Sequence, residues 1–172
     1  MLELKKETKK ELIIYGSIIL AIILIRTFIV TPVRVNGTSM YSTLNDGEIM
    51  ILNKINYRFN DIKRFDIVVV KTESNKIIKR VIGLPGETLK YENNTLYING
   101  QEVKEPYLKE GTEDFNISEL GYKKIPQDCY FVMGDNRDNS SDSRIIGCVK
   151  KDQIEGKTSL VVFPFKNAGH RN

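Results

Sequence analysis

The chain has 172 residues, enough for one domain of ordinary size with a buried core. Its 26 Lys and Arg residues against 22 Asp and Glu residues give a net charge of +4, without a block of like charges, so we expect no nucleic-acid partner. The single histidine, His170, lies in a polar tail, which excludes Ser-His-Asp and Cys-His catalysis unless the tail folds back into a site. Two cysteines are too few for a tetrahedral zinc site built from Cys and His.

An apolar stretch covers residues 12–30 and reads LIIYGSIILAIILIRTFIV. At about 1.5 Å per residue, a helix of this length roughly matches the hydrocarbon thickness of a bilayer. Its one charge, Arg26, lies near the end, where the side chain can extend to the interface. Pro32 disfavours helical structure at Thr31. We therefore predict a transmembrane helix over residues 12–31.

The distribution of basic residues predicts the orientation of this helix. Four lysines precede it (Lys5, Lys6, Lys9 and Lys10), whereas the next twenty residues after it carry only Arg34. By the positive-inside rule, residues 1–11 form a cytoplasmic tail and residues 32–172 lie outside the cell membrane. A cleaved signal peptide is an alternative, but its apolar region should be shorter and followed by small residues. A buried core helix is a second alternative, disfavoured because the stretch is apolar on all sides.

Beyond residue 32 the pattern changes to short runs rich in Val, Ile, Tyr and Phe, which are typical of β-strands. Asn93-Asn94 and Asn99-Gly100 have the pattern of hairpin turns. A mostly β domain follows, because no long segment here has helical periodicity. Residues 101–127 are polar, and we assign them to a variable excursion over about residues 88–127. Strands are expected at residues 33–35, 49–52, 66–71, 77–82, 95–98, 129–133 and 160–163.

Cys129 and Cys148 flank a segment that begins with one of these expected strands. If both cysteines lie on neighbouring strands, their Cα atoms can come within the roughly 4.4–6.8 Å that a disulfide requires. A location outside the membrane permits such a bond. Two buried free thiols are an equal alternative, because nothing in the sequence fixes the pairing.

A serine, Ser39, lies in a glycine-containing turn shortly after the apolar stretch. Without a histidine, a nucleophilic serine needs another base, and a lysine can serve if burial keeps it neutral. Lys79 is the best candidate, since it lies in an expected strand whose two faces are apolar apart from Lys79 and Arg80. Arginine stays protonated, so only the lysine can act as a base. The alternative is a pair of solvated cations on an edge strand.

The most polar part of the chain is residues 134–144, GDNRDNSSDSR, directly after the expected strand 129–133. Its two arginines and three aspartates predict a network of ion pairs within the loop. The spacing lacks the order of a calcium-binding EF-hand loop. A generic solvated loop is the alternative.

Four blocks of residues, in this order, resemble the bacterial type I signal peptidases, which are membrane-anchored Ser/Lys proteases that remove signal peptides from exported proteins. The resemblance extends over about residues 31–164 and implies a β-barrel-like catalytic domain after a single anchor, as in the short Gram-positive forms. The blocks are residues 37–44 (GTSMYSTL), 66–69 (DIVV), 79–87 (KRVIGLPGE) and 134–144.

The resemblance implies roles for single residues. Ser39 resembles the nucleophile and Lys79 the general base. The supporting residues are Ser140, which resembles the serine that orients the lysine, the ion pair Asp142 and Arg144, and Met40 in the substrate cleft. The implied activity is cleavage of preproteins after Ala-x-Ala at the outer membrane surface, by a monomer that uses no cofactor or metal. The implied partners are preprotein signal peptides and membrane lipid.

Two positions depart from the family pattern. Ser42 stands where the family usually has proline, and Phe65 stands where it usually has glycine. Gly37 cannot supply the side-chain donor that assists the oxyanion in some members, but glycine is also common there in the Gram-positive branch. A self-cleaving Ser/Lys protease of the repressor type is a rival interpretation, disfavoured by the expected anchor. A non-catalytic membrane-anchored β module is another, disfavoured because the residues with implied catalytic roles are all retained.

Overall fold

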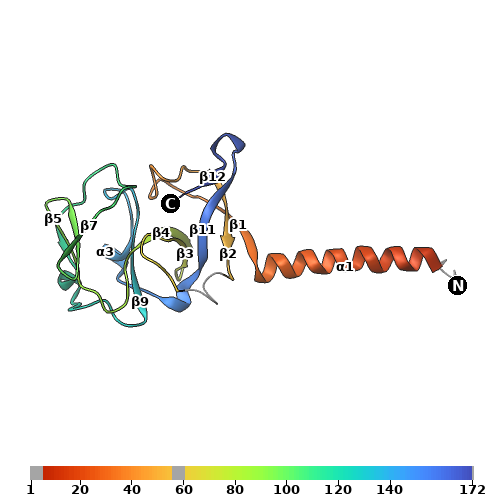
Figure 1. Cartoon of the computed structure of the whole chain (residues 1–172), viewed down its shortest axis with the longest axis horizontal. Coiled ribbons are helices and arrows are strands. Elements are labelled where there is room, and N and C mark those ends of the chain that lie inside the picture. Colours follow the sequence, from red (N-terminus) through yellow and green to blue (C-terminus); the bar gives the residue numbers. More distant parts are fainter. Residues whose placement is uncertain (1–5, 56–60, 172) are drawn as a thin grey trace.

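The computed structural model describes residues 6–55 and 61–171. Helix α1 (Lys6–Phe28) projects away from a β body (Figure 1). Large apolar side chains between Leu12 and Ile25 are exposed along it. Within the described ranges, no helix combines the length and the apolar character needed to cross a membrane. The transmembrane helix expected over residues 12–31 is therefore not confirmed.

The larger sheet has eight strands in the order β1-β2-β11-β3-β4-β9-β10, with β12 paired to β11. All its pairs are antiparallel. The register shifts three times along β11, and such bulges bend a strand, in keeping with the curled shape of the sheet (Figure 1). The strands are β1 (Val30–Arg34), β2 (Ile49–Asn53), β3 (Ile67–Lys71), β4 (Lys76–Gly83), β9 (Cys129–Met133), β10 (Val149–Lys150), β11 (Ile154–Phe163) and β12 (Gly169–His170).

A second, four-stranded sheet has the order β7-β6-β5-β8 and lies within the excursion expected over about residues 88–127. The two predicted hairpin turns are confirmed: Asn93-Asn94 joins β5 to β6 with φ values of 50° and 61°, and Asn99-Gly100 joins β6 to β7 with 50° and 80°. These left-handed conformations suit Asn and Gly. Its strands are β5 (Leu89–Glu92), β6 (Thr95–Ile98), β7 (Gln101–Val103) and β8 (Phe115–Asn116).

The remaining described elements are short helices, namely η1 (Ile117–Leu120), α3 (Ser143–Ile146), η2 (Lys151–Gln153) and η3 (Phe165–Asn167). The first predicted strand was placed too late, because β1 begins at Val30 and contains Pro32. Proline is tolerated there because β1 is an edge strand of the sheet. The last was also placed too late, because β11 begins at Ile154 and alternates buried with half-buried residues.

Three clusters of buried apolar residues hold the sheets together. One lies under residues 35–44 and includes Val35, Met40 and Leu44, each at most 3% exposed. Each such side chain contributes about 1.5–3 kcal/mol when buried. Another joins the second sheet to β4 and β9 through Ile82, Tyr91 and Phe131, among others. Burial on both sides of Ser39 therefore fixes the turn that carries it.

Cys129 and Cys148 are both free, so the two-thiol alternative describes this structure. Cys129 lies opposite Lys150 in the register of β9 and β10, which places Cys148 diagonally across from it. Burial is the main cause that raises the pKa of the Cys129 thiol to about 12, and the neighbouring Cys148 thiol adds to it.

Candidate active site

The turn that carries Ser39 is fixed by backbone hydrogen bonds as well as by burial. Gly37 has φ +85°, a conformation that favours glycine, and its N–H donates to Asp46 Oδ1 at 2.7 Å. The Leu44 N–H donates to the Met40 carbonyl at 2.8 Å. Ser39 itself is half-buried between these contacts. The turn therefore presents the Ser39 side chain at a defined position.

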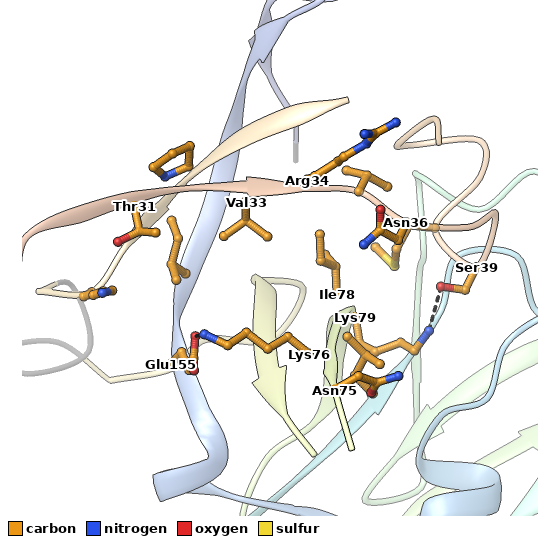
Figure 2. A pocket seen from close by; sticks show the side chains of 16 residues that line it. Thr31, Val33, Arg34, Asn36, Ser39, Asn75, Lys76, Ile78, Lys79 and Glu155 are labelled. Atoms are coloured by element: carbon orange, nitrogen blue, oxygen red, sulfur yellow. Dashed lines mark hydrogen bonds and ion pairs between the residues drawn. The ribbon is translucent and has the colours of Figure 1, made fainter. Parts of the chain in front are cut away.

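Lys79 is the side chain that meets this serine. It lies on β4, which runs between β3 and β9, and only 3% of it is exposed. Its Nζ is 2.7 Å from Ser39 Oγ (Figure 2). The edge-strand alternative is therefore wrong for this pair of cations, since Arg80 is also completely buried.

The pKa of Lys79 lies below its ordinary value of 10.5, and burial is the main cause because it disfavours the charged amine. Asp142 and Asp135 act in the opposite direction, and Arg144 lowers the pKa further. A lysine in this environment releases its proton more readily than one in water. The site can therefore supply a neutral amine as a base.

The polar loop at residues 134–144 lies directly against the Ser39 turn. The Asn136 backbone N–H donates to the Ser39 carbonyl at 3.0 Å, and its side chain donates to the Thr38 carbonyl at 3.2 Å. Asn139 Nδ2 donates to Thr38 Oγ1 at 3.0 Å. These bonds join two segments that lie about a hundred residues apart in the sequence, so the loop and the turn position one another.

Asp142 organises the loop from its interior. The carboxylate is 0% exposed and accepts hydrogen bonds from the Gly134 N–H at 3.0 Å and from Arg144 Nε at 2.9 Å. It also caps α3 through the Arg144 N–H. Burial alone would raise the pKa of Asp142, but the bonds from Arg144 and Gly134 hold it below its ordinary value.

Ser140 lies beside Asp142 and Gly134. Its Oγ is buried and makes no hydrogen bond to Lys79, but it lies close enough to Asp142 to help lower the pKa of that carboxyl. It packs against Gly134, where an added Cβ would come within 2.3 Å of Ser140 Oγ and 2.4 Å of the Ser39 carbonyl oxygen. Only glycine permits this close approach.

A cleft of about 460 Å³ begins at Ser39. β1 lines one side and the start of β4 lines the other (Figure 2). Met40 and Ile78 contribute apolar surface near Ser39, and the ion pair of Lys76 with Glu155, at 2.7 Å, lies toward the far end. Residues 6–55 and 61–171 contain no cluster of His, Cys, Asp or Glu that could hold a metal ion.

Comparison with known proteins places the chain in a family. The sequence model of the family described as "Signal peptidase, peptidase S26" matches residues 8–163. The chain belongs to this family.

Named relatives of this S26 signal peptidase include signal peptidase I T of Bacillus subtilis, which is 45% identical over 94% of this chain and 90% of its own. Signal peptidase IB of Staphylococcus aureus is 37% identical over 97% and 95% of the two chains. A crystal structure of a signal peptidase I from Enterococcus faecalis V583 is 40% identical with a TM-score of 0.53, and it covers 57% of this chain and 97% of its own.

The ion pairs of the S26 signal peptidase differ from those that the sequence predicted. Only Asp142 and Arg144 pair within the loop. Asp135 pairs instead with Arg80 on β4 at 2.6 Å. Arg137 pairs with Glu105, which belongs to the excursion, at 2.6 Å. The expected self-contained network is wrong because Asp135 and Arg137 are buried, and their partners lie on β4 and in the segment between β7 and β8.

Both departures from the family pattern lie at unusual backbone positions. Phe65 has φ +72°, a left-handed conformation that glycine adopts without strain. Its ring packs edge-on against Tyr107, with centroids 5.3 Å apart. The peptide bond between Tyr41 and Ser42 is cis.

Proposed function

We propose that this S26 signal peptidase is an endopeptidase that cleaves N-terminal signal peptides from exported preproteins, with Ser39 as nucleophile and Lys79 as general base. The observation that carries the proposal is the 2.7 Å approach of a buried lysine amine to a serine hydroxyl at the end of a cleft. The names of the relatives from Bacillus and Staphylococcus support the choice of substrate.

In the proposed mechanism the neutral Lys79 amine accepts the Ser39 proton while Ser39 Oγ attacks the scissile carbonyl carbon. The Ser39 backbone N–H donates to the oxyanion that forms. The Lys79 ammonium then protonates the leaving amine as the peptide bond breaks and an ester to Ser39 remains. Lys79 next accepts a proton from water, whose oxygen attacks the ester. The proton returns to Ser39 Oγ as the signal peptide leaves as a carboxylate.

The surrounding loop supports this cycle in the proposal. The resemblance gives Ser140 the role of orienting the Lys79 amine, and the position of its buried Oγ against Gly134, beside the Ser39 turn, supports that assignment. The Asp142–Arg144 pair maintains the shape of the loop. Neither residue exchanges a proton with the substrate.

The proposed substrate binds as an extended strand. Among residues 6–55 and 61–171, no strand pairs with the outer edge of β1, and β9 pairs with β4 only from Arg80 onward. Residues 76–79 of β4 are therefore available on that side. A peptide between these two edges gains main-chain hydrogen bonds on each side. Met40 and Ile78 reduce the space beside Ser39, which favours small residues such as those of Ala-x-Ala.

We also propose that residues 12–31 anchor the chain, with the tail in the cytoplasm and the catalytic domain outside. The support is the run of exposed apolar side chains on α1 and the lysines that precede it. Such a tether would hold the site at a high effective concentration of membrane-bound substrate. An external protease added to intact spheroplasts should digest the β body. Digestion of the tail alone would contradict this orientation.

The cleavage test uses the full chain in detergent and a preprotein whose signal peptide ends in Ala-x-Ala, with the new N-terminus read by mass spectrometry. Ser39→Ala and Lys79→Ala should both lose cleavage. Ser74→Ala and Lys71→Ala are matched controls at exposed positions and should cleave like the wild type. Cleavage that survives in Lys79→Ala would rule out the lysine base.

A further inference from the structure

Glu105 is a buried carboxylate on which three polar side chains converge. It lies in the segment between β7 and β8, and its side chain is 6% exposed. It accepts hydrogen bonds from Arg137 Nη2 at 2.6 Å, from the Tyr107 hydroxyl at 2.6 Å and from the Tyr91 hydroxyl at 3.0 Å. A buried charge with this many donors fixes the positions of all its partners.

The first path from Glu105 leads to the nucleophile through Arg137. Arg137 is 2% exposed, and its Nε donates to the Gly134 carbonyl at 3.0 Å. Gly134 is the residue pressed against Ser140 Oγ and the Ser39 carbonyl. A displacement of Arg137 would therefore be passed through one peptide unit to the Ser39 turn.

The second path leads to the base through Tyr107. The Tyr107 ring lies against the guanidinium of Arg80, 3.8 Å from its centroid. Arg80 directly follows Lys79 on β4, and it pairs with Asp135 in the polar loop. The two paths thus reach the loop and the strand that together enclose the Lys79 amine.

We propose that Glu105 is a positioning residue for the Ser39–Lys79 pair, acting through Arg137 and Tyr107 to keep the polar loop closed over the lysine. The inference rests on the proposed cleavage activity. It assigns a part in catalysis to the segment between β7 and β8, which contributes no residue that lines the cleft. Glu105 touches neither substrate nor reacting atoms.

If Glu105 positions the Ser39–Lys79 pair, its loss should change the pH dependence of the cleavage rate. Three charged groups of the loop face Lys79, namely Asp142, Arg144 and Asp135, and Arg80 is its neighbour on β4. If the loop loosens, water reaches the amine and the pKa of Lys79 rises toward its ordinary value. The acid limb of the pH profile, which is the rise of kcat with pH as Lys79 loses its proton, then moves to higher pH. A purely structural role would lower the amount of folded enzyme without moving this limb.

The test is Glu105→Gln in the full chain in detergent, with kcat and KM measured against pH on a signal-peptide substrate, well below the unfolding temperature. The amide keeps the size of the side chain but leaves Arg137 without its counter-charge. We expect kcat to fall about tenfold or more, KM to change by less than about threefold, and the acid limb to move up by about half a pH unit or more. Glu102→Gln, an exposed carboxylate on β7, should behave like the wild type.

Tyr107→Phe tests the second path if Glu105→Gln does not fold, because it removes one bond to Glu105 and keeps the ring against Arg80. A smaller shift of the acid limb in the same direction is expected. An unchanged limb in the folded variants, with or without a lower rate, would overturn the positioning role. Failure of the wild type to cleave would instead refute the proposed function itself.

Discussion

Lys79 Nζ and Ser39 Oγ lie 2.7 Å apart, and Lys79 has no ion-pair partner among the described residues. Its neighbour Arg80 is equally buried but forms two hydrogen bonds to the Asp135 carboxylate, at 2.9 and 2.6 Å. Of these two adjacent cations on β4, Arg80 is therefore neutralised by a carboxylate and Lys79 is not. The difference matters because only the unpaired amine can give up its proton without leaving a buried carboxylate alone.

Replacement of Lys79 by methionine should separate its catalytic role from its structural one. Lys79→Met keeps the length of the side chain and removes a buried amine, so we expect cleavage to fall by about a thousandfold or more, with stability unchanged or higher. Lys79→Arg should also be inactive, because arginine cannot become neutral at working pH. The measurements are kcat/KM and thermal unfolding of the same preparations. An active Lys79→Arg would contradict the base role.

The pH dependence follows from the lowered pKa of Lys79. Activity should rise with pH through that lowered pKa, because the neutral amine is the reactive form. For stability the native state binds its proton more weakly than the unfolded state, so the cost of the buried charge is present in full below the lowered pKa. That cost is relieved as pH rises toward the ordinary value of 10.5.

A comparison of melting curves can check this sign. The difference in unfolding temperature between Lys79→Met and the wild type should be largest at low pH and should narrow as pH rises toward 10.5. A gap that widens with pH would mean that the native site binds the proton more tightly than the unfolded chain. Such a result would exclude Lys79 as a lysine kept neutral by burial.

The two partners of the Arg80–Asp135 pair should be coupled in stability, because removal of one leaves the other buried without its counter-charge. Both side chains are at most 2% exposed, so Asp135→Asn leaves a buried guanidinium uncompensated, and we expect a loss of about 3–5 kcal/mol in urea unfolding. Arg80→Met combined with Asp135→Asn should cost less than the sum of the single changes. Glu92→Gln breaks the exposed Lys90–Glu92 pair and should leave the urea midpoint almost unchanged. Additive single effects would contradict the coupling.

The sequence predicted the strands and turns that a short run of residues specifies by itself. The strands around residues 49–52, 66–71, 77–82 and 129–133 are runs of β-branched and aromatic residues, and they appear as β2, β3, β4 and β9. The hairpin turns also follow from two adjacent residues. β7 and β8 were missed because strands of three and two residues, largely polar, carry no periodic signal.

In the candidate site, too, local features were predicted and contacts between distant segments were missed. The absence of a catalytic histidine and the apolar setting of Lys79 made this lysine a candidate base for Ser39, and the resemblance to the signal peptidases then assigned the pair. The partners of Asp135 and Arg137 were not, because they lie 55 and 32 residues away along the chain and are fixed only when the sheets pack. Glu105 gave no signal at all, since a single carboxylate in a polar segment looks like a solvated one.

At Phe65, substitution by glycine should destabilise the protein less than substitution by alanine. Its left-handed backbone costs a side-chain-bearing residue about 1–2 kcal/mol, whereas its ring gains contacts with Tyr107. Both Phe65→Ala and Phe65→Gly lose the ring, but only glycine relieves the backbone. We expect Phe65→Gly to be more stable than Phe65→Ala by about 1 kcal/mol in urea unfolding, the reverse of the order at ordinary positions. The ordinary order would mean that the backbone here is not strained.

Gly134→Ala should impair both the fold and the reaction, since this residue separates Ser39 from Ser140. The new methyl group would lie 2.3 Å from Ser140 Oγ and 2.4 Å from the Ser39 carbonyl oxygen. The serine side chain can rotate away, but the carbonyl belongs to the backbone of the nucleophile turn and must move. We expect a loss of about 1–3 kcal/mol of stability in urea unfolding, together with a lower kcat in the molecules that remain folded.

Gly16→Ala is the matched control, because an added Cβ there meets nothing within 4 Å and alanine is favoured in a helix. It should not lower the stability and should leave the rate of cleavage unchanged. If Gly134→Ala lost stability but kept the wild-type kcat, the nucleophile turn would have to tolerate a shift of its backbone. The close packing of the polar loop against Ser39 would then serve the fold alone, and the loop could not position the nucleophile.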